Sequence, residues 1–169
     1  MIEALHLRRS IRNIRPGLWR RKFCPISCGP PFGINRPTSG DRTAPYWRHV
    51  MVIDIYLAMV DVVWLHEPEG AQAAGTPAQK YSRRDRHAGF VAKAPLNLVY
   101  VAHGERMDDI SAEDRPLYAW VDSGFIGQNV YLLCTSEELA TVFRAALDYT
   151  KLAPTTELGT GQFVAFAQS

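Results

Sequence analysis

The chain has 169 residues, enough for one globular domain with a substantial core. Its 47% hydrophobic and 21% charged residues are ordinary for such a domain, and its odd number of cysteines, three, argues against a disulfide framework. The net charge of +2 hides an asymmetry, because residues 1–50 hold ten Lys and Arg against two Asp and Glu, whereas residues 51–169 hold nine against fifteen. A basic N-terminal arm of this kind can hold a phosphate, a nucleic acid or the acidic part of its own fold.

The first half of the chain predicts one short helix and one hairpin. Residues 2–10 carry apolar side chains at helical spacing, which predicts the helix. Residues 17–32 fit neither helical nor strand periodicity, and residues 37–45 form a polar loop rich in turn residues. Residues 52–58 and 62–66 are rich in branched and aromatic side chains, which predicts two strands joined by a tight turn.

The second half predicts a buried strand, a long helix and a final strand. Residues 67–89 are rich in Ala, Gly, Gln and Arg without useful periodicity, so they form either an exposed loop or a disordered segment. Residues 96–102 are a branched and aromatic run that predicts a buried strand. A capping-box pattern at residues 111–114 precedes a helix predicted over residues 117–134, and residues 162–168 predict the last strand.

The predicted helix at residues 117–134 is apolar on nearly every face, which indicates a helix enclosed by protein, within one chain or between subunits. Its small residues Ala119, Ser123 and Gly127 fall four apart and predict a flat ridge against which a second helix packs. Three polar residues interrupt the apolar surface and need hydrogen-bond partners once buried: Asp122, Gln128 and Asn129. Because these residues would be costly in lipid, we predict no membrane span.

The chain shows no secretory signal and no complete metal site. Charged residues interrupt its first apolar positions, so we expect a soluble, cytoplasmic protein. Cys24 and Cys28 lack a second pair of ligands nearby, so we expect no zinc. Cys134 falls in the predicted buried helix and is expected to act as a small hydrophobic residue.

Several segments of the chain together resemble one known family. They are EALHLRRSIR (3–12), FGINRPTSGDRTAP (32–45), IDIYLAMVDVVWL (53–65), APLNLVYVA (94–102), DSGFIGQNVYL (122–132) and CTSEELATV (134–142). On these segments the sequence is similar to the nitroreductase-like FMN-dependent oxidoreductases, and specifically to their short branch related to peptide-azoline dehydrogenases. The resemblance covers most of the chain.

The resemblance implies a fold and an assembly. The expected fold is α+β: a single nitroreductase-like domain over residues 1–169, with helices around a central, mostly antiparallel sheet. The expected assembly is a homodimer with two flavin sites at the subunit interface. Segments 17–32 and 67–89 are atypical of the family although their flanks match. One hypothesis is that each is a short out-of-frame stretch of the gene, which resequencing would test.

The arginine-rich start of the chain is the main candidate for cofactor binding. The resemblance assigns Arg8, Arg9, Ser10 and Arg12 to the phosphate and ribityl chain of FMN. Guanidinium groups and a hydroxyl suit a dianionic phosphate, and a helix continuing through residue 12 would place Arg8 and Arg12 on one face. From the residues alone, the alternative is a solvated basic helix end.

The resemblance places further cofactor contacts after the long helix. In relatives, the backbone of the segment matching Ser136, Glu137, Glu138 and Leu139 approaches the flavin ring, and the resemblance implies an extended turn around residues 139–143. The local sequence favours a capped helix over residues 136–148 instead. Glu138 stands where the family has glycine, a residue that permits close backbone approach and a positive φ.

Two more positions complete the candidate site. Gln128 can bind the cofactor, the substrate or the partner subunit, or it can form a buried amide pair with Asn129. Arg48 matches the first residue of an Arg-Asn-Trp-Gln-like run whose amide faces the flavin in relatives. His49 then either replaces that amide as a donor or is an exposed loop histidine.

The implied function is two-electron transfer by ping-pong exchange, from NAD(P)H through FMN to a nitroaromatic or quinone-like acceptor. In the azoline branch, the flavin instead oxidises a peptide heterocycle. Since the cofactor carries this chemistry, we assign no catalytic acid–base residue. One alternative is a degenerate, non-catalytic flavin-binding or structural relative, which His49 and Glu138 favour. A second, a nucleic-acid binder, finds little support in the scattered aromatic residues.

Overall fold

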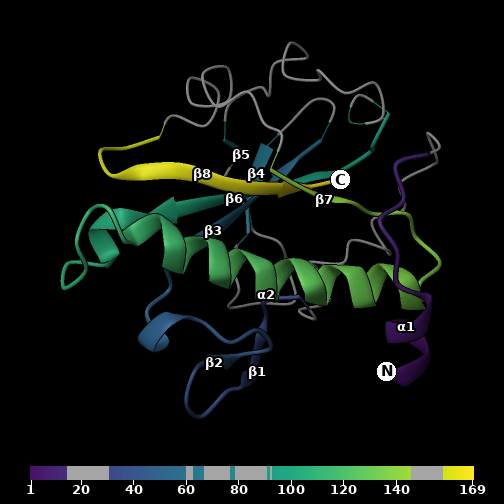
Figure 1. The fold of residues 1–169 in the computed structure, drawn as a ribbon, viewed down its shortest axis with the longest axis horizontal. Coiled ribbons are helices and arrows are strands. Elements are labelled where there is room, and N and C mark those ends of the chain that lie inside the picture. Colours follow the sequence, from purple (N-terminus) through teal and green to yellow (C-terminus); the bar gives the residue numbers. More distant parts are fainter. Residues whose placement is uncertain (15–30, 60–62, 67–76, 79–90, 92, 146–157) are drawn as a thin grey trace.

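Figure 1 shows the computed structural model of the chain, which describes residues 1–14, 31–59, 63–66, 77–78, 91, 93–145 and 158–169. The predictions for Cys24 and Cys28 lie outside these residues. The atypical segments also lie outside them, apart from residues 31–32 and 77–78. The assignment of residues 1–169 to one domain therefore stays a prediction.

An antiparallel sheet forms the centre of the described residues (Figure 1). Its strand order is β5-β4-β3-β6-β8-β7, and every neighbouring pair is antiparallel. The strands are β3 (Ile53–Ala58), β4 (Val63–Leu65), β5 (Pro77–Ala78), β6 (Asn97–His103), β7 (Phe143–Arg144) and β8 (Gln162–Gln168). The predicted hairpin, buried strand and final strand are confirmed, and so is the α+β fold class.

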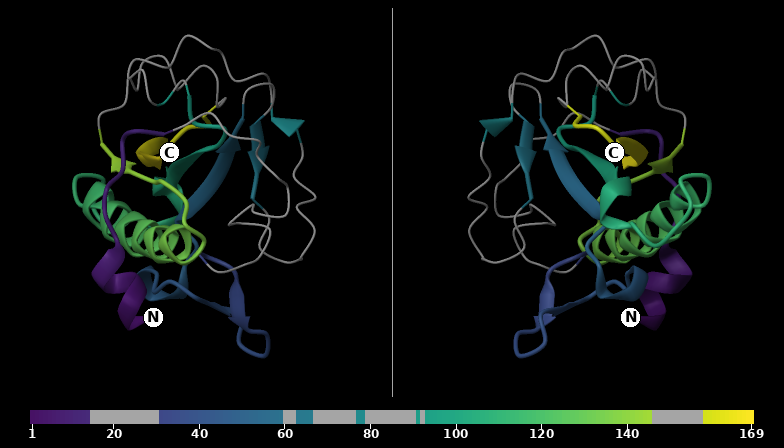
Figure 2. Two further views of the ribbon diagram at one scale, coloured as in Figure 1. Left: turned by 90° about the vertical axis from the view of Figure 1, so that its right-hand side faces the viewer. Right: turned by 90° about the vertical axis from the view of Figure 1, so that its left-hand side faces the viewer.

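A long helix, α2 (Arg115–Ser136), lies across one face of this sheet (Figures 1 and 2). It follows a turn in which the Ser111 hydroxyl donates to the Asp114 carboxylate at 2.8 Å and accepts from the Asp114 N–H at 3.2 Å. Pro116 stands in the first turn of the helix, where its missing N–H is tolerated. The Ser111–Asp114 bonds thus close the turn before the helix, whereas Asp114, the N-cap of α2, makes no side-chain capping bond.

The smaller described elements lie mostly on the side of α2 away from the sheet (Figure 2). They are α1 (Ile2–Leu7), the hairpin of β1 (Ile34–Arg36) and β2 (Asp41–Arg42), and the 3-10 turns η2 (Trp47–His49) and η4 (Gly104–Arg106). The hairpin replaces part of the loop predicted over residues 37–45. No helix among the described residues has both the length and the hydropathy that a membrane span requires.

Strand β6 divides the apolar core between the two faces of the sheet. Leu98, Tyr100 and Ala102 pack into the cluster under α2, whereas Val99 and Val101 pack into a second cluster on the opposite face. Successive side chains of a strand point to opposite faces, so a strand covered on both sides needs apolar residues at every position. The continuous apolar run in the sequence therefore marks the most buried strand, all of whose residues are buried.

The small residues of α2 pack against the sheet, which corrects the prediction of a second packed helix. Ala119 and Ser123 are fully buried. A Cβ atom added to Gly127 would lie 2.5 Å from the ring of Phe143 and 3.4 Å from the side-chain oxygen of Gln168. The ridge thus lets β7 and β8 approach the helix closely.

A second face of α2 is exposed in the single chain, so one chain alone does not enclose the helix. The exposed apolar residues are Leu117, Trp120, Val121 and Phe125, whose exposed fractions lie between 43% and 56%. Their spacing of three and four residues places them in one stripe along the helix. A contiguous apolar stripe of this kind is typical of an interaction surface.

Two predicted helix boundaries are wrong. Helix α1 ends at Leu7 because Arg8 has extended backbone angles, φ −56° and ψ 127°, so Arg8 and Arg12 do not share a helical face. Helix α2 ends at Ser136, and the chain then extends into β7. The extended turn implied by the family resemblance is therefore confirmed, and the helix favoured by the local sequence after residue 136 does not form over residues 137–145.

Candidate functional site

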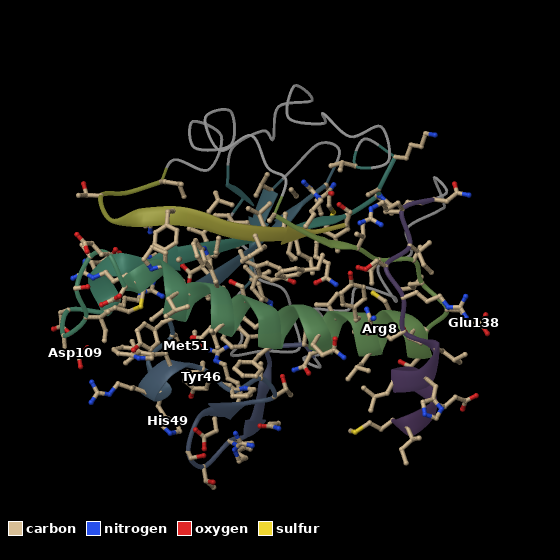
Figure 3. All side chains as sticks on the ribbon, viewed as in Figure 1. Arg8, Tyr46, His49, Met51, Asp109 and Glu138 are labelled. Atoms are coloured by element: carbon tan, nitrogen blue, oxygen red, sulfur yellow. The ribbon has the colours of Figure 1, made fainter. Side chains whose placement is uncertain are left out.

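Residues 8–12 form an arginine-rich arm. This arm lies against the C-terminal turns of α2, where Figure 3 labels Arg8. The guanidinium carbon of Arg8 lies 4.8 Å from the centroid of the Tyr131 ring, within cation–π range. The Ser10 hydroxyl lies 2.7 Å from the Tyr131 hydroxyl, and the Ile11 N–H donates to the Thr141 carbonyl at 2.9 Å. These contacts join the arm both to α2 and to the segment that follows it.

The turn after α2 lies at the same end of the helix (Figure 3). Glu137 and Glu138 are exposed, whereas the Leu139 N–H donates to the Cys134 carbonyl at 2.7 Å and its side chain packs on the core. Glu138 has φ +57°, the left-handed conformation that glycine adopts without strain. The backbone thus keeps the shape of the family's glycine position, at a cost of roughly 1–2 kcal/mol for a non-glycine residue.

The arm presents cations that no carboxylate neutralises within the described residues. Arg8 is half-buried, and Arg9 and Arg12 are exposed. The arginine–carboxylate pairs found among the described residues involve other arginines. Guanidinium groups without carboxylate partners, together with the Ser10 hydroxyl, are the donor set that a dianionic phosphate requires. These residues therefore fit the phosphate end of FMN.

Arg48 lies near the N-terminal half of α2 instead. It pairs with the Asp109 carboxylate, and the neighbouring Trp47 N–H donates to Asp122 Oδ2 at 2.9 Å. Asp122 contacts the segment of Arg48, and Tyr131 contacts the arm. These two residues of α2 are nine positions apart, or roughly 14 Å along the helix. Within one chain, Arg48 therefore does not join the arginine-rich arm.

The side chains of His49 and Gln128 have different surroundings. His49 has a 79% exposed side chain, and its Nδ1 lies 3.1 Å from Asp41 Oδ1, so the interpretation as an exposed loop histidine holds in the single chain. The Gln128 side chain is half-buried and has no hydrogen-bond partner among the described residues. Asn129 donates to the Pro31 carbonyl at 3.1 Å, so the two amides do not form a pair.

The described residues present no activated nucleophile at this site. Burial raises the pKa of the Cys134 thiol to about 11, which makes it the inert core residue that we predicted. Burial also raises the pKa of Asp122 to about 6, against the lowering effect of the Trp47 N–H. No group of three or more potential metal ligands occurs in the described part of the chain.

Sequence reasoning missed Tyr131, which contacts the arginine-rich arm, and Asp109, which pairs with Arg48. In the helical pattern, Tyr131 counts as an apolar position, although a buried tyrosine hydroxyl usually requires a hydrogen-bond partner. That requirement was the available signal for its contact with the arm. Asp109 follows β6 in an exposed turn, and no local pattern links it to Arg48, 61 residues earlier.

The family model of the Nitroreductase family matches residues 42–167. The chain therefore belongs to the Nitroreductase family, as its sequence segments indicated. No curated protein sequence matches the chain.

Solved structures agree with this assignment. A "putative nitroreductase" from Ralstonia eutropha JMP134 is 27% identical, with a TM-score of 0.88 over 99% of this chain and 80% of that chain. Two more distant structures share the fold. The microcin synthetase McbBCD complex of E. coli, with truncated pro-MccB17 bound, is 16% identical, with a TM-score of 0.74 over 94% of this chain and 64% of that chain. The NADPH:FMN oxidoreductase of Vibrio harveyi, complexed with NAD+, is 18% identical, with a TM-score of 0.64 over 99% and 66%.

Proposed function

We propose that this protein is an FMN-dependent oxidoreductase. The observation that carries the proposal is the arginine-rich arm, in which Arg8, Arg9 and Arg12 lack carboxylate partners among the described residues and lie with Ser10 beside the turn after α2. Membership of the Nitroreductase family makes oxidoreductase activity the expected chemistry.

The residues of the chain bind and orient the cofactor. Arg8, Arg9 and Arg12 neutralise the phosphate, and Ser10 donates a hydrogen bond to it. The backbone of residues 137–139 would contact the ring system, and Gln128 would offer the cofactor a side-chain amide that has no other partner in the described structure. When bound, the flavin accepts and passes on two electrons, so the protein needs no acid–base residue of its own.

The functional unit that we propose is a homodimer. The exposed stripe around Trp120 supplies an apolar surface on α2. The separation of Arg48 from the arm supports the same proposal, because a second copy can bring its Arg48 to a site that one chain leaves incomplete. Each flavin would then be bound by residues of both subunits.

The proposed electron donor is NAD(P)H, and the proposed acceptor is a nitroaromatic or quinone-like compound. The likeness to the NADPH:FMN oxidoreductase of Vibrio harveyi supports this cofactor pair. The likeness to the microcin synthetase complex supports a related dehydrogenation as the alternative reaction. We propose neither a nucleic acid nor a membrane as a partner.

A flavin titration tests the proposal. Purified protein should quench the fluorescence of added FMN, and anaerobic NADH or NADPH should then bleach the bound flavin. The double variant Arg8→Ala/Arg12→Ala should lose most FMN affinity, whereas Lys93→Ala, which removes an exposed cation elsewhere, should keep it. Unchanged FMN binding in the double variant would refute the proposed phosphate site.

A degenerate relative is the second candidate. His49, which stands in place of the family's amide, is exposed and pairs with Asp41, and Glu138 occupies a strained glycine position. A protein that binds FMN but is not bleached by either nicotinamide would be a non-catalytic flavin-binding relative. A folded protein that takes up no flavin would be a structural one.

Sedimentation analysis tests the proposed dimer. Trp120→Glu places a charge in the middle of the exposed stripe and should yield monomers, because an unpaired charge is costly at an apolar interface. Ala112→Glu adds the same charge at an exposed position just before α2 and should leave the dimer intact. A monomeric wild-type protein would contradict the shared site.

A further inference from the structure

Tyr131 is the residue through which α2 contacts both the arginine-rich arm and the start of β7. Its side chain is only 7% exposed. The Tyr131 hydroxyl accepts from the Phe143 N–H at 2.8 Å and lies 2.7 Å from the Ser10 hydroxyl, 121 positions earlier in the chain. One buried hydroxyl thus joins two segments of the candidate site.

The direction of the hydrogen bond between the two hydroxyls follows from this geometry. The Phe143 N–H can only donate, so it occupies a lone pair of the Tyr131 oxygen. The phenolic proton then needs an acceptor, and within the described residues the Ser10 oxygen is the acceptor in reach. When Tyr131 donates to Ser10, the proton of the Ser10 hydroxyl is left to donate elsewhere.

Ser10 is exposed, so its free proton can reach a ligand in solution. The ring of Tyr131 also holds the Arg8 guanidinium, whose carbon lies 4.8 Å from the ring centroid. This cation–π contact holds the Arg8 guanidinium beside the ring, and a guanidinium keeps several N–H donors for an anion. The phenol therefore orients a neutral donor with its hydroxyl and a cationic donor with its ring.

We propose that Tyr131 is a positioning residue for the flavin phosphate, because its hydroxyl orients Ser10 as a donor to that phosphate and its ring fixes Arg8. The inference rests on the proposed function, since it assigns a role at the same FMN site. Tyr131 itself does not touch the phosphate and acts through Ser10 and Arg8.

The first test compares FMN with riboflavin, which lacks the phosphate. Tyr131→Phe keeps the ring and removes the hydroxyl, so it should weaken FMN binding by about fivefold, the effect of one net hydrogen bond, and riboflavin binding by less than about twofold. The matched control is Tyr100→Phe, which removes another buried hydroxyl, bonded to Gln168 at 2.9 Å rather than to Ser10. It should leave the preference for FMN over riboflavin unchanged.

The second test is a double-mutant cycle on FMN affinity. Ser10→Ala, at an exposed position, should weaken FMN binding by about tenfold, because it removes a hydrogen bond to a charged group. If Tyr131 acts through Ser10, adding Tyr131→Phe to Ser10→Ala should cause little further loss. Independent effects would instead multiply to about fiftyfold.

Each outcome decides between the inference and its failure. Equal losses of FMN and riboflavin in Tyr131→Phe, or multiplied losses in the double variant, would mean a merely structural role and overturn the inference. If Tyr131→Phe does not fold, unchanged FMN affinity in Ser10→Ala overturns it. Wild-type protein that binds neither flavin refutes the proposed function itself, whereas FMN binding that is insensitive to both substitutions refutes the roles of Ser10 and Tyr131 and leaves FMN binding standing.

Discussion

The imidazole Nε2 of His103 lies 2.7 Å from Asp54 Oδ2, which ties the end of β6 to the start of β3. On its other side, His103 Nδ1 lies 3.0 Å from Glu105 Oε1, and the Gln162 amide faces the same ring. Arg106 donates to the second oxygen of Asp54 at 3.2 Å. The buried ring is thus held between two carboxylates, the arrangement that favours its protonated form.

This cluster predicts a pH-dependent contribution to stability. Burial lowers the pKa of His103, but the hydrogen bonds to Asp54 and Glu105 outweigh it, so the pKa is raised above 6.5. The stabilisation is therefore complete below about pH 6.5 and is lost as the pH rises through the raised value.

Urea unfolding of the wild type and of His103→Gln from pH 5 to 9 measures this contribution. The stability difference between them should shrink as the pH rises. The control His6→Gln replaces an exposed histidine of α1 and should change stability by less than about 0.5 kcal/mol. A difference that is constant with pH would show that His103 does not carry a charge in the fold.

Asp122 also predicts a loss of stability with rising pH, in a lower pH range. Burial raises its pKa from 3.8 to about 6, so it lowers stability progressively as the pH rises through this window. Asp122→Asn removes the buried charge and keeps an oxygen to accept from the Trp47 N–H. We expect it to stabilise the protein by up to about 3 kcal/mol at pH 7.5 and by little below pH 4.

Chemical unfolding at these two pH values provides the comparison. Asp108→Asn, at an exposed position, is the matched control and should change stability by less than about 0.5 kcal/mol at either pH. Equal effects of the two substitutions at pH 7.5 would contradict the burial of the Asp122 carboxylate.

Gly127→Ala should destabilise the fold by about 1–3 kcal/mol through overpacking. The added methyl group would lie 2.5 Å from the Phe143 ring, which stacks on Phe166 and cannot withdraw freely. Thermal unfolding measures the loss. Gly159→Ala, whose methyl group would find only ordinary contacts with Gln162 at 3.6 Å or more, should be nearly neutral. Similar melting temperatures for both variants would show that α2 does not pack this closely on β7.

Glu138→Gly should stabilise the protein by up to about 1 kcal/mol, because glycine adopts its φ of +57° without strain. Glu137→Gly, one position earlier at φ −102°, should instead lower stability through the greater flexibility of the unfolded chain. Thermal unfolding distinguishes the two. If Glu138→Gly were the less stable variant, the left-handed turn would not form.

The sequence determined the elements whose pattern is local. The apolar run of residues 96–102 is β6, and the capping pattern at residues 111–114 precedes α2. Strand and helix periodicities reflect burial on one face or two, so they can be read directly from the order of the residues. The family resemblance in turn predicted the extended turn around residues 139–143, where local propensity favours a helix.

Only the tertiary structure decided which distant residues meet. No pattern in the chain relates Ser10 to Tyr131, or Arg48 to Asp109, because these pairs join through packing across more than sixty positions. The same limit explains the ridge of small residues in α2. Spacing fixes which residues share a helix face, but whether a sheet or a helix covers that face depends on how the whole chain folds.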